Sequence, residues 1–166
     1  MVVLRLVHIV LGALWVGSVF ALTAVVAPGM QALGLPLDPV MRTLEHKKFP
    51  QLMMTFGGLS ILAGLTMLYI LSKGFQPDFM GSRFGATLSF GGLCAILALV
   101  VGATVQRPAT ARTAALRAEM KNNPKPGEDP RQAEVNALQR RIVMAGRIVL
   151  ALLILTVSAM AVARYL

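Results

Sequence analysis

The chain has 166 residues, of which 56% are hydrophobic and 14% are charged, whereas soluble domains carry roughly 25% charged residues. This composition excludes an ordinary soluble globule and supplies enough apolar sequence for several membrane spans. The net charge is +9, but the basic residues flank apolar segments as membrane topology predicts, so nucleic acid is not an expected partner. The single cysteine, Cys94, excludes an internal disulfide and the usual zinc and iron–sulfur sites, which need several thiolates.

Four charge-poor segments each reach the ~20 residues that a helix needs to cross the hydrocarbon core of a bilayer. They run from about 6 to 26, 49 to 72, 84 to 106 and 142 to 163. Backbone groups in lipid must form their hydrogen bonds internally, so segments of this length must be helices. We therefore predict an all-α integral membrane protein, with residues 1–166 forming one transmembrane four-helix bundle.

The first segment, RLVHIVLGALWVGSVF over residues 5–20, carries a histidine inside an apolar run. His8, Gly12, Trp15 and Phe20 fall on one broad helical face, and an ionisable residue within a span indicates a functional site. The run is long and lacks an AxA-type cleavage site, so we predict a retained span and not a signal peptide. It is expected to end at Ala27-Pro28-Gly29.

Small residues mark the expected contacts between helices, because they allow backbones to approach closely in lipid. The second segment carries Gly57, Ser60 and Gly64, and the third carries Gly81, Gly85, Ser89, Gly92 and Gly102. The loop over 27–48 is rich in proline, and LDPVMRTLEHKKF within it predicts a short surface helix.

The segment over 107–141 has helical composition in 109–121 and 131–141, separated by the turn-forming NNPKPGEDP. We expect the third and fourth spans to continue as a helical hairpin, with Asp129 capping the returning helix and Pro130 at its first position. The hairpin is either a solvated charged extension or a docking arm for a partner or for anionic lipid. Arg147, one turn inside the fourth segment, can extend its side chain to the head groups.

Lys and Arg are distributed unevenly between the two sides of the predicted bundle. The side with both termini and the 73–83 loop holds four of them, and the side with the 27–48 and 107–141 loops, counted through Arg147, holds twelve. The positive-inside rule then places those two loops in the cytoplasm and both termini outside a bacterial-type inner membrane.

Two histidines are present, and a full membrane thickness of ~30 Å separates them, so they do not form one bis-histidine haem site. His46 is read as a solvated interfacial residue. His8 is either an interfacial residue bonded to water or head groups, or a neutral metal ligand facing the bundle interior. Met67 and Met160 lie at similar predicted depth, and His with Met suits haem iron or Cu(I). No span contains a carboxylate, so no catalytic acid–base pair is predicted.

The pattern His-x6-Trp-Val-Gly, here His8, Trp15, Val16 and Gly17, lies within a sequence that resembles the copper-resistance D-type membrane proteins. It is also similar to the wider group of small helical-bundle membrane proteins that includes the haem-binding bacterial protoporphyrinogen oxidase. The resemblance covers about a dozen residues and, in its four-span layout, the whole chain in outline. It implies a haem b or copper ligand at His8 alone. The second histidine-or-lysine environment of the oxidase-like group has no counterpart that we can place, which argues against oxidase activity.

Two functions of different classes follow from these observations. In the first, the protein holds a haem b or copper site on His8, with Met67 or Met160 as the second ligand. In the second, it is a non-catalytic accessory or structural subunit that packs through its glycine rows against a larger membrane complex, or against further copies of itself. The near absence of polar residues within the spans motivates the second.

Overall fold

Every long apolar segment of the chain forms a helix. The computed structural model describes residues 1–35, 38–124 and 129–166, and all regular structure within these ranges is helical. Four continuous helices are long and apolar enough to cross a membrane, over Val2–Ala32, Phe49–Leu71, Arg83–Asn122 and Arg131–Ala163. The prediction of an all-α multi-pass membrane protein with four candidate spans is therefore confirmed.

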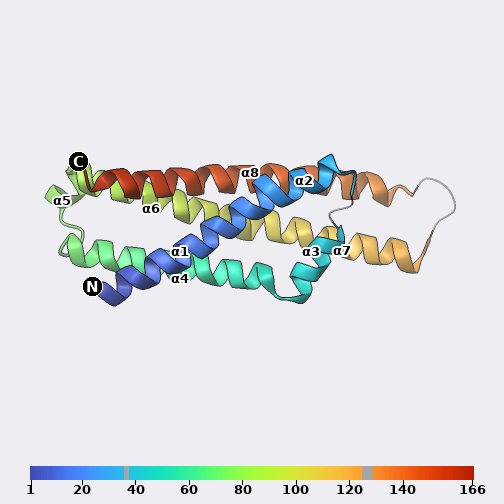
Figure 1. Ribbon diagram of the computed structural model, residues 1–166, viewed down its shortest axis with the longest axis horizontal. Coiled ribbons are helices and arrows are strands. Elements are labelled where there is room, and N and C mark those ends of the chain that lie inside the picture. The colour runs from blue at the N-terminus through green and yellow to red at the C-terminus, as the bar shows by residue number, and fades with distance from the viewer. Residues whose placement is uncertain (36–37, 125–128) are drawn as a thin grey trace.

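The helices follow one another along the chain with short connections, as Figure 1 shows. In order they are α1 (Val2–Phe20), η1 (Ala21–Val26), α2 (Ala27–Ala32), α3 (Asp38–His46), α4 (Phe49–Leu71), α5 (Pro77–Gly81), α6 (Arg83–Val101), η2 (Gly102–Gln106), α7 (Arg107–Asn122) and α8 (Arg131–Ala163). The π-helical segments η1 and η2 join their neighbours into uninterrupted rods. The rod of α6, η2 and α7 runs beside α8, and α1 crosses α4 near the N-terminus and α8 further along (Figure 1).

The two most extensive contacts between helices are those of α6 with α8 and of α1 with α4. In the first pair, Gly91 is buried against Ala159, and the Thr156 hydroxyl donates to the Gly91 carbonyl oxygen at 3.1 Å. The apolar core where the pairs meet contains five buried side chains: Trp15, Ala95, Ala98, Val149 and Leu153. Small residues thus let α6 and α8 come into contact, as expected in lipid.

The glycine row predicted for the third span is partly wrong. A Cβ added at Gly81, Gly92 or Gly102 would meet nothing within 4 Å, so these three do not mediate close contacts. Gly91, one residue before the predicted Gly92, is the position that faces α8. The four-residue spacing alone could not distinguish these neighbours, because it does not fix which face of the helix meets a partner.

The first helix does not end at Ala27-Pro28-Gly29, and the prediction that it would is wrong. Pro28 lacks an N–H group, and its ring in a regular α-helix would clash with the carbonyl four residues earlier. The structure widens the helix into the π-helical segment η1 just before Pro28, where the Ala27 N–H bonds the Leu22 carbonyl five residues back. The helix therefore continues to Ala32. A π-helical segment also precedes Pro108. There η2 leads into α7, and the Arg107 N–H bonds the Gly102 carbonyl five residues back.

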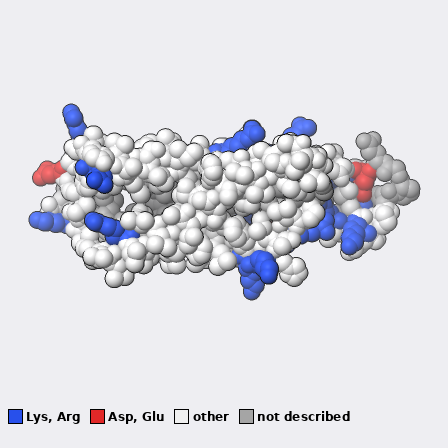
Figure 2. All heavy atoms as spheres, in the orientation of Figure 1, with Lys and Arg blue, Asp and Glu red and all other residues white. Residues whose placement is uncertain are grey.

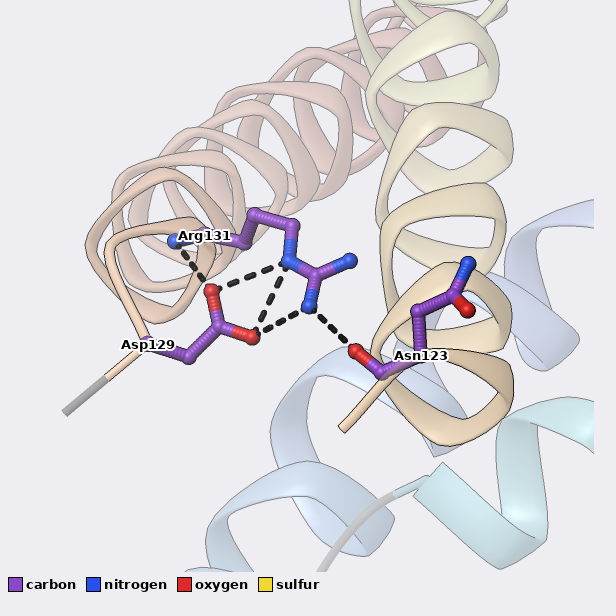
Figure 3. A network of polar contacts seen from close by, with 3 residues as sticks. All are labelled: Asn123, Asp129 and Arg131. Atoms are coloured by element: carbon purple, nitrogen blue, oxygen red, sulfur yellow. Dashed lines mark hydrogen bonds and ion pairs between the residues drawn. The ribbon is translucent and has the colours of Figure 1, made fainter. Parts of the chain in front are cut away.

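The predicted helical hairpin is present as α7 and the first part of α8. It has its own buried seam, which contains Ala109, Thr113, Leu116 and Val135. The predicted cap is confirmed in that Asp129 Oδ1 accepts the Arg131 backbone N–H at 3.0 Å, although α8 begins at Arg131 and Pro130 precedes it. The Arg131 guanidinium also bonds Asp129 and donates to the Asn123 carbonyl at 2.8 Å (Figure 3). The bond to Asp129 raises the pKa of Arg131, and the three residues tie the end of α7 to the start of α8.

Candidate functional site

His8 lies where α1 crosses α4, and it is half-buried there. Its Nδ1 is 2.8 Å from the carbonyl oxygen of Ser60. A carbonyl can only accept, so Nδ1 carries the proton and donates this bond. The Ser60 hydroxyl donates in return to the His8 carbonyl oxygen at 3.0 Å. His8 and Ser60 therefore form two reciprocal hydrogen bonds that join α1 to α4.

Glycines on both helices make this approach possible. A Cβ at Gly64 would lie 2.9 Å from His8 Cε1 and 3.1 Å from Nδ1, so the imidazole rests directly against the backbone of α4. A Cβ at Gly12 would lie 3.1 Å from the Ser60 hydroxyl oxygen. The row of Gly57, Ser60 and Gly64 predicted as a packing face is thus confirmed, with α1 as its partner.

Trp15 completes the contact between α1 and α4. A Cβ at Gly57 would lie 2.8 Å from the Trp15 ring, which is 6% exposed. His8, Gly12 and Trp15 therefore share one face of α1, as predicted. Phe20 does not belong to it, since its side chain is 50% exposed and η1 begins at the next residue. A regular pitch projected from His8 is too coarse to place a residue three turns away.

The pairing with Ser60 fixes the depth of His8 in the span. Gly64 precedes Leu71, the last residue of α4, by seven residues, which corresponds to about 10 Å along the helix axis. The ring therefore lies inside the apolar segment and has a partner from the protein. Ser60 is the hydrogen-bond partner of His8, whereas the sequence predicted only a packing role for it. Counting from the ends of the spans did not predict this pairing, because it placed Met67, seven residues further along the same span, at the level of His8.

The two methionines predicted near His8 occupy different helix pairs. Met67 is half-buried on the face of α4 that carries Ser60 and Gly64, about one turn beyond Gly64. Met160 packs on α6, where its Cγ would lie 3.6 Å from a Cβ at Gly91. The structure thus brings His8 together with Ser60 and Gly64, and ligation by either thioether stays a prediction. His46, the last residue of α3, is exposed at the opposite end of the bundle from the N-terminus, as predicted (Figure 1).

The chemistry available at His8 follows from its tautomer. In the neutral ring with Nδ1 protonated, Nε2 holds the lone pair and can act as an acceptor or a ligand. Metal-binding histidines are commonly oriented by such a bond from the other nitrogen to a carbonyl. Within the residues that the structure describes, no group of three His, Cys, Asp or Glu could hold an ion. The donor set around His8 therefore fits a cofactor that needs one imidazole, or one imidazole with thioethers.

Comparison with models of known protein families, with curated proteins and with solved structures yields no match for this chain.

Proposed function

We propose that the protein is a four-span inner-membrane protein in which His8 would hold haem b or Cu(I) through Nε2. The observation that carries the proposal is the 2.8 Å bond from His8 Nδ1 to the Ser60 carbonyl oxygen. It holds the imidazole in the tautomer and orientation that a metal ligand requires. Met67 or Met160 would supply a second, thioether ligand. A group bound there would provide one-electron redox chemistry.

In this proposal, the rest of the chain positions the His8 ring and shields the bound group from water. Ser60 and Gly64 fix the ring from the side of α4. The apolar segment around them would keep water away from a bound group. The basic loops over 27–48 and 107–141 face the cytoplasm and both termini face outward, which puts His8 in the outer half of the bilayer. Figure 2 shows charged side chains at the left end and over the right half, with an uncharged stretch between them, as expected of a bundle that crosses a bilayer.

The test is the visible spectrum and metal content of protein purified from cells grown with ample haem precursor and copper. The wild type should show a Soret band or bound copper, and His8→Ala should abolish either one. His46→Ala is the matched control and should leave the signal intact, because His46 is exposed at the other end of the bundle. A colourless, copper-free wild type would overturn the proposal. The alternative hypothesis, a non-catalytic accessory subunit, would then be favoured, and co-purification with a larger membrane complex would support it.

A further inference from the structure

A second polar site lies at the far end of the bundle from His8. A groove of about 1100 Å³ opens between the extension of the first helix, α3, the η2–α7 rod and the start of α8. This volume exceeds that of most small-molecule sites, which measure ~300–1,000 Å³. The groove begins where the apolar part of α8 gives way to its charged part, so it would lie at the edge of the membrane.

Cations dominate the rim of the groove. Among the described residues that line it, five are Lys or Arg and one, Glu45, is a carboxylate. The five are Arg42 from α3, Arg117 and Lys121 from α7, and Arg140 and Arg147 from α8. Arg42, Arg140 and Arg147 are exposed and form no ion pair within the described part of the chain. Two helices, α3 and α8, thus direct uncompensated positive charge toward one opening.

The floor of the groove offers polar groups that the fold does not use. A Cβ at the buried Gly146 would lie 3.5 Å from Thr23 Oγ1 and 3.6 Å from Gln106 Nε2, so both side chains converge on this point of α8. Neither the Thr23 hydroxyl nor the Gln106 amide forms a hydrogen bond within the ranges that the structure describes. By contrast, the Thr104 hydroxyl bonds the carbonyl four residues before it, at 2.8 Å. Thr23 belongs to η1 and Gln106 to η2, and π-helical turns frequently occur at functional sites.

The walls of the groove are apolar beside these polar groups. Leu22 from η1 and Ile142, Val143 and Met144 from α8 line it. A small inorganic ion would leave these side chains without a partner, whereas an amphiphile would cover them with its acyl chain. Basic pockets between membrane helices at the cytoplasmic face recognise acidic lipid head groups.

We propose that this groove binds an anionic phospholipid. Its phosphate lies among Arg42, Arg140 and Arg147, its glycerol and ester oxygens face Thr23 and Gln106, and its acyl chain leaves the groove past Leu22 toward the apolar part of the bundle. This assignment does not depend on a cofactor at His8.

The test measures lipid retained by the full chain. Protein is reconstituted in vesicles of phosphatidylcholine and phosphatidylglycerol in equal amounts, extracted in mild detergent, and analysed by native mass spectrometry. The wild type should retain phosphatidylglycerol selectively. Arg42→Gln/Arg140→Gln/Arg147→Gln should weaken this retention on the order of 100-fold, because each basic residue near an anionic lipid contributes roughly fivefold. The matched control, Lys73→Gln/Arg83→Gln/Arg164→Gln, removes the same charge at the opposite end and should retain lipid like the wild type.

Two further arms separate the alternatives. Thr23→Val/Gln106→Leu keeps the charge and the shape, and it should weaken retention several-fold even if the triple arginine variant fails to fold. Glycerol 3-phosphate, which has the phosphate without the acyl chain, should not displace the lipid. Displacement by glycerol 3-phosphate would show that the groove takes a soluble phosphate and would overturn the proposal. Equal retention of the two lipids, or equal losses in the groove and control variants, would overturn it as well.

Discussion

The contact between His8 and Gly64 can be tested by adding a single methyl group. Gly64→Ala places a Cβ 2.9 Å from His8 Cε1, where ordinary contacts are 3.4–4 Å. The ring must therefore move by at least about half an ångström, because repulsion rises steeply below the optimal separation. Such a movement lengthens the 2.8 Å bond from Nδ1 to the Ser60 carbonyl oxygen beyond good hydrogen-bond geometry.

The expected magnitude combines three terms. Overpacking costs about 1–3 kcal/mol. An interhelical hydrogen bond within a membrane averages about 0.6 kcal/mol. Alanine is the better helix former by about 1 kcal/mol, which acts in the opposite direction. Gly58→Ala is a matched control on the same helix, since a Cβ there meets nothing within 4 Å and only the propensity term remains. The free energy of unfolding of Gly64→Ala should therefore be lower than that of Gly58→Ala by about 1.5–3.5 kcal/mol.

Reversible unfolding in mixed micelles of mild detergent and dodecyl sulfate provides the measurement. The single tryptophan, Trp15, is buried in the same contact between α1 and α4, so its fluorescence reports their separation. Ser60→Ala should lower the free energy of unfolding less than Gly64→Ala does. The carbonyl of residue 60 still accepts the bond from His8 Nδ1, and only the bond from the Ser60 hydroxyl is lost. Equal stability of the Gly64→Ala and Gly58→Ala variants would refute the placement of the ring against Gly64.

Three other predictions address topology, the hairpin and the thioethers. A cysteine at the exposed Gln76 should react with an impermeant reagent on intact cells and one at the exposed Glu119 should not, because the Lys and Arg bias predicts that 107–141 lies in the cytoplasm. The reverse labelling would show that the topology is inverted. Replacing residues 109–140 by a flexible linker should leave a protein that still inserts, since the hairpin has its own buried seam, and failure to insert would make the hairpin integral to the fold. If a haem is bound, Met67→Leu or Met160→Leu should shift its potential, whichever methionine supplies the second ligand, and an unchanged potential in both variants would exclude thioether ligation.

The sequence predicted the helices well because their signal is local. Long segments without charge must be helical in lipid, and Gly57, Ser60 and Gly64 mark a packing face within a single helix. The register between helices is not local. That His8 meets Ser60 depends on where α1 crosses α4, which no periodicity within either segment records. Counting residues from the helix ends predicted that Met160 lies at the same depth as His8. Equal depth does not imply contact, and Met160 packs on α6.

The sequence did not predict the groove for a related reason. Its lining comes from six separate elements, and the sequence predicted that the first helix would end at one of its lining residues, Pro28. Pro28 and Pro108 each follow a π-helical segment that absorbs the missing hydrogen bond and keeps the helix continuous. The two segments place Thr23 and Gln106 opposite each other, and Gly146 lets both reach α8. A proline inside an apolar run therefore need not end a span. The two prolines explain why the first and third helices become π-helical at η1 and η2. These segments carry Thr23 and Gln106, which line the groove together with its basic residues.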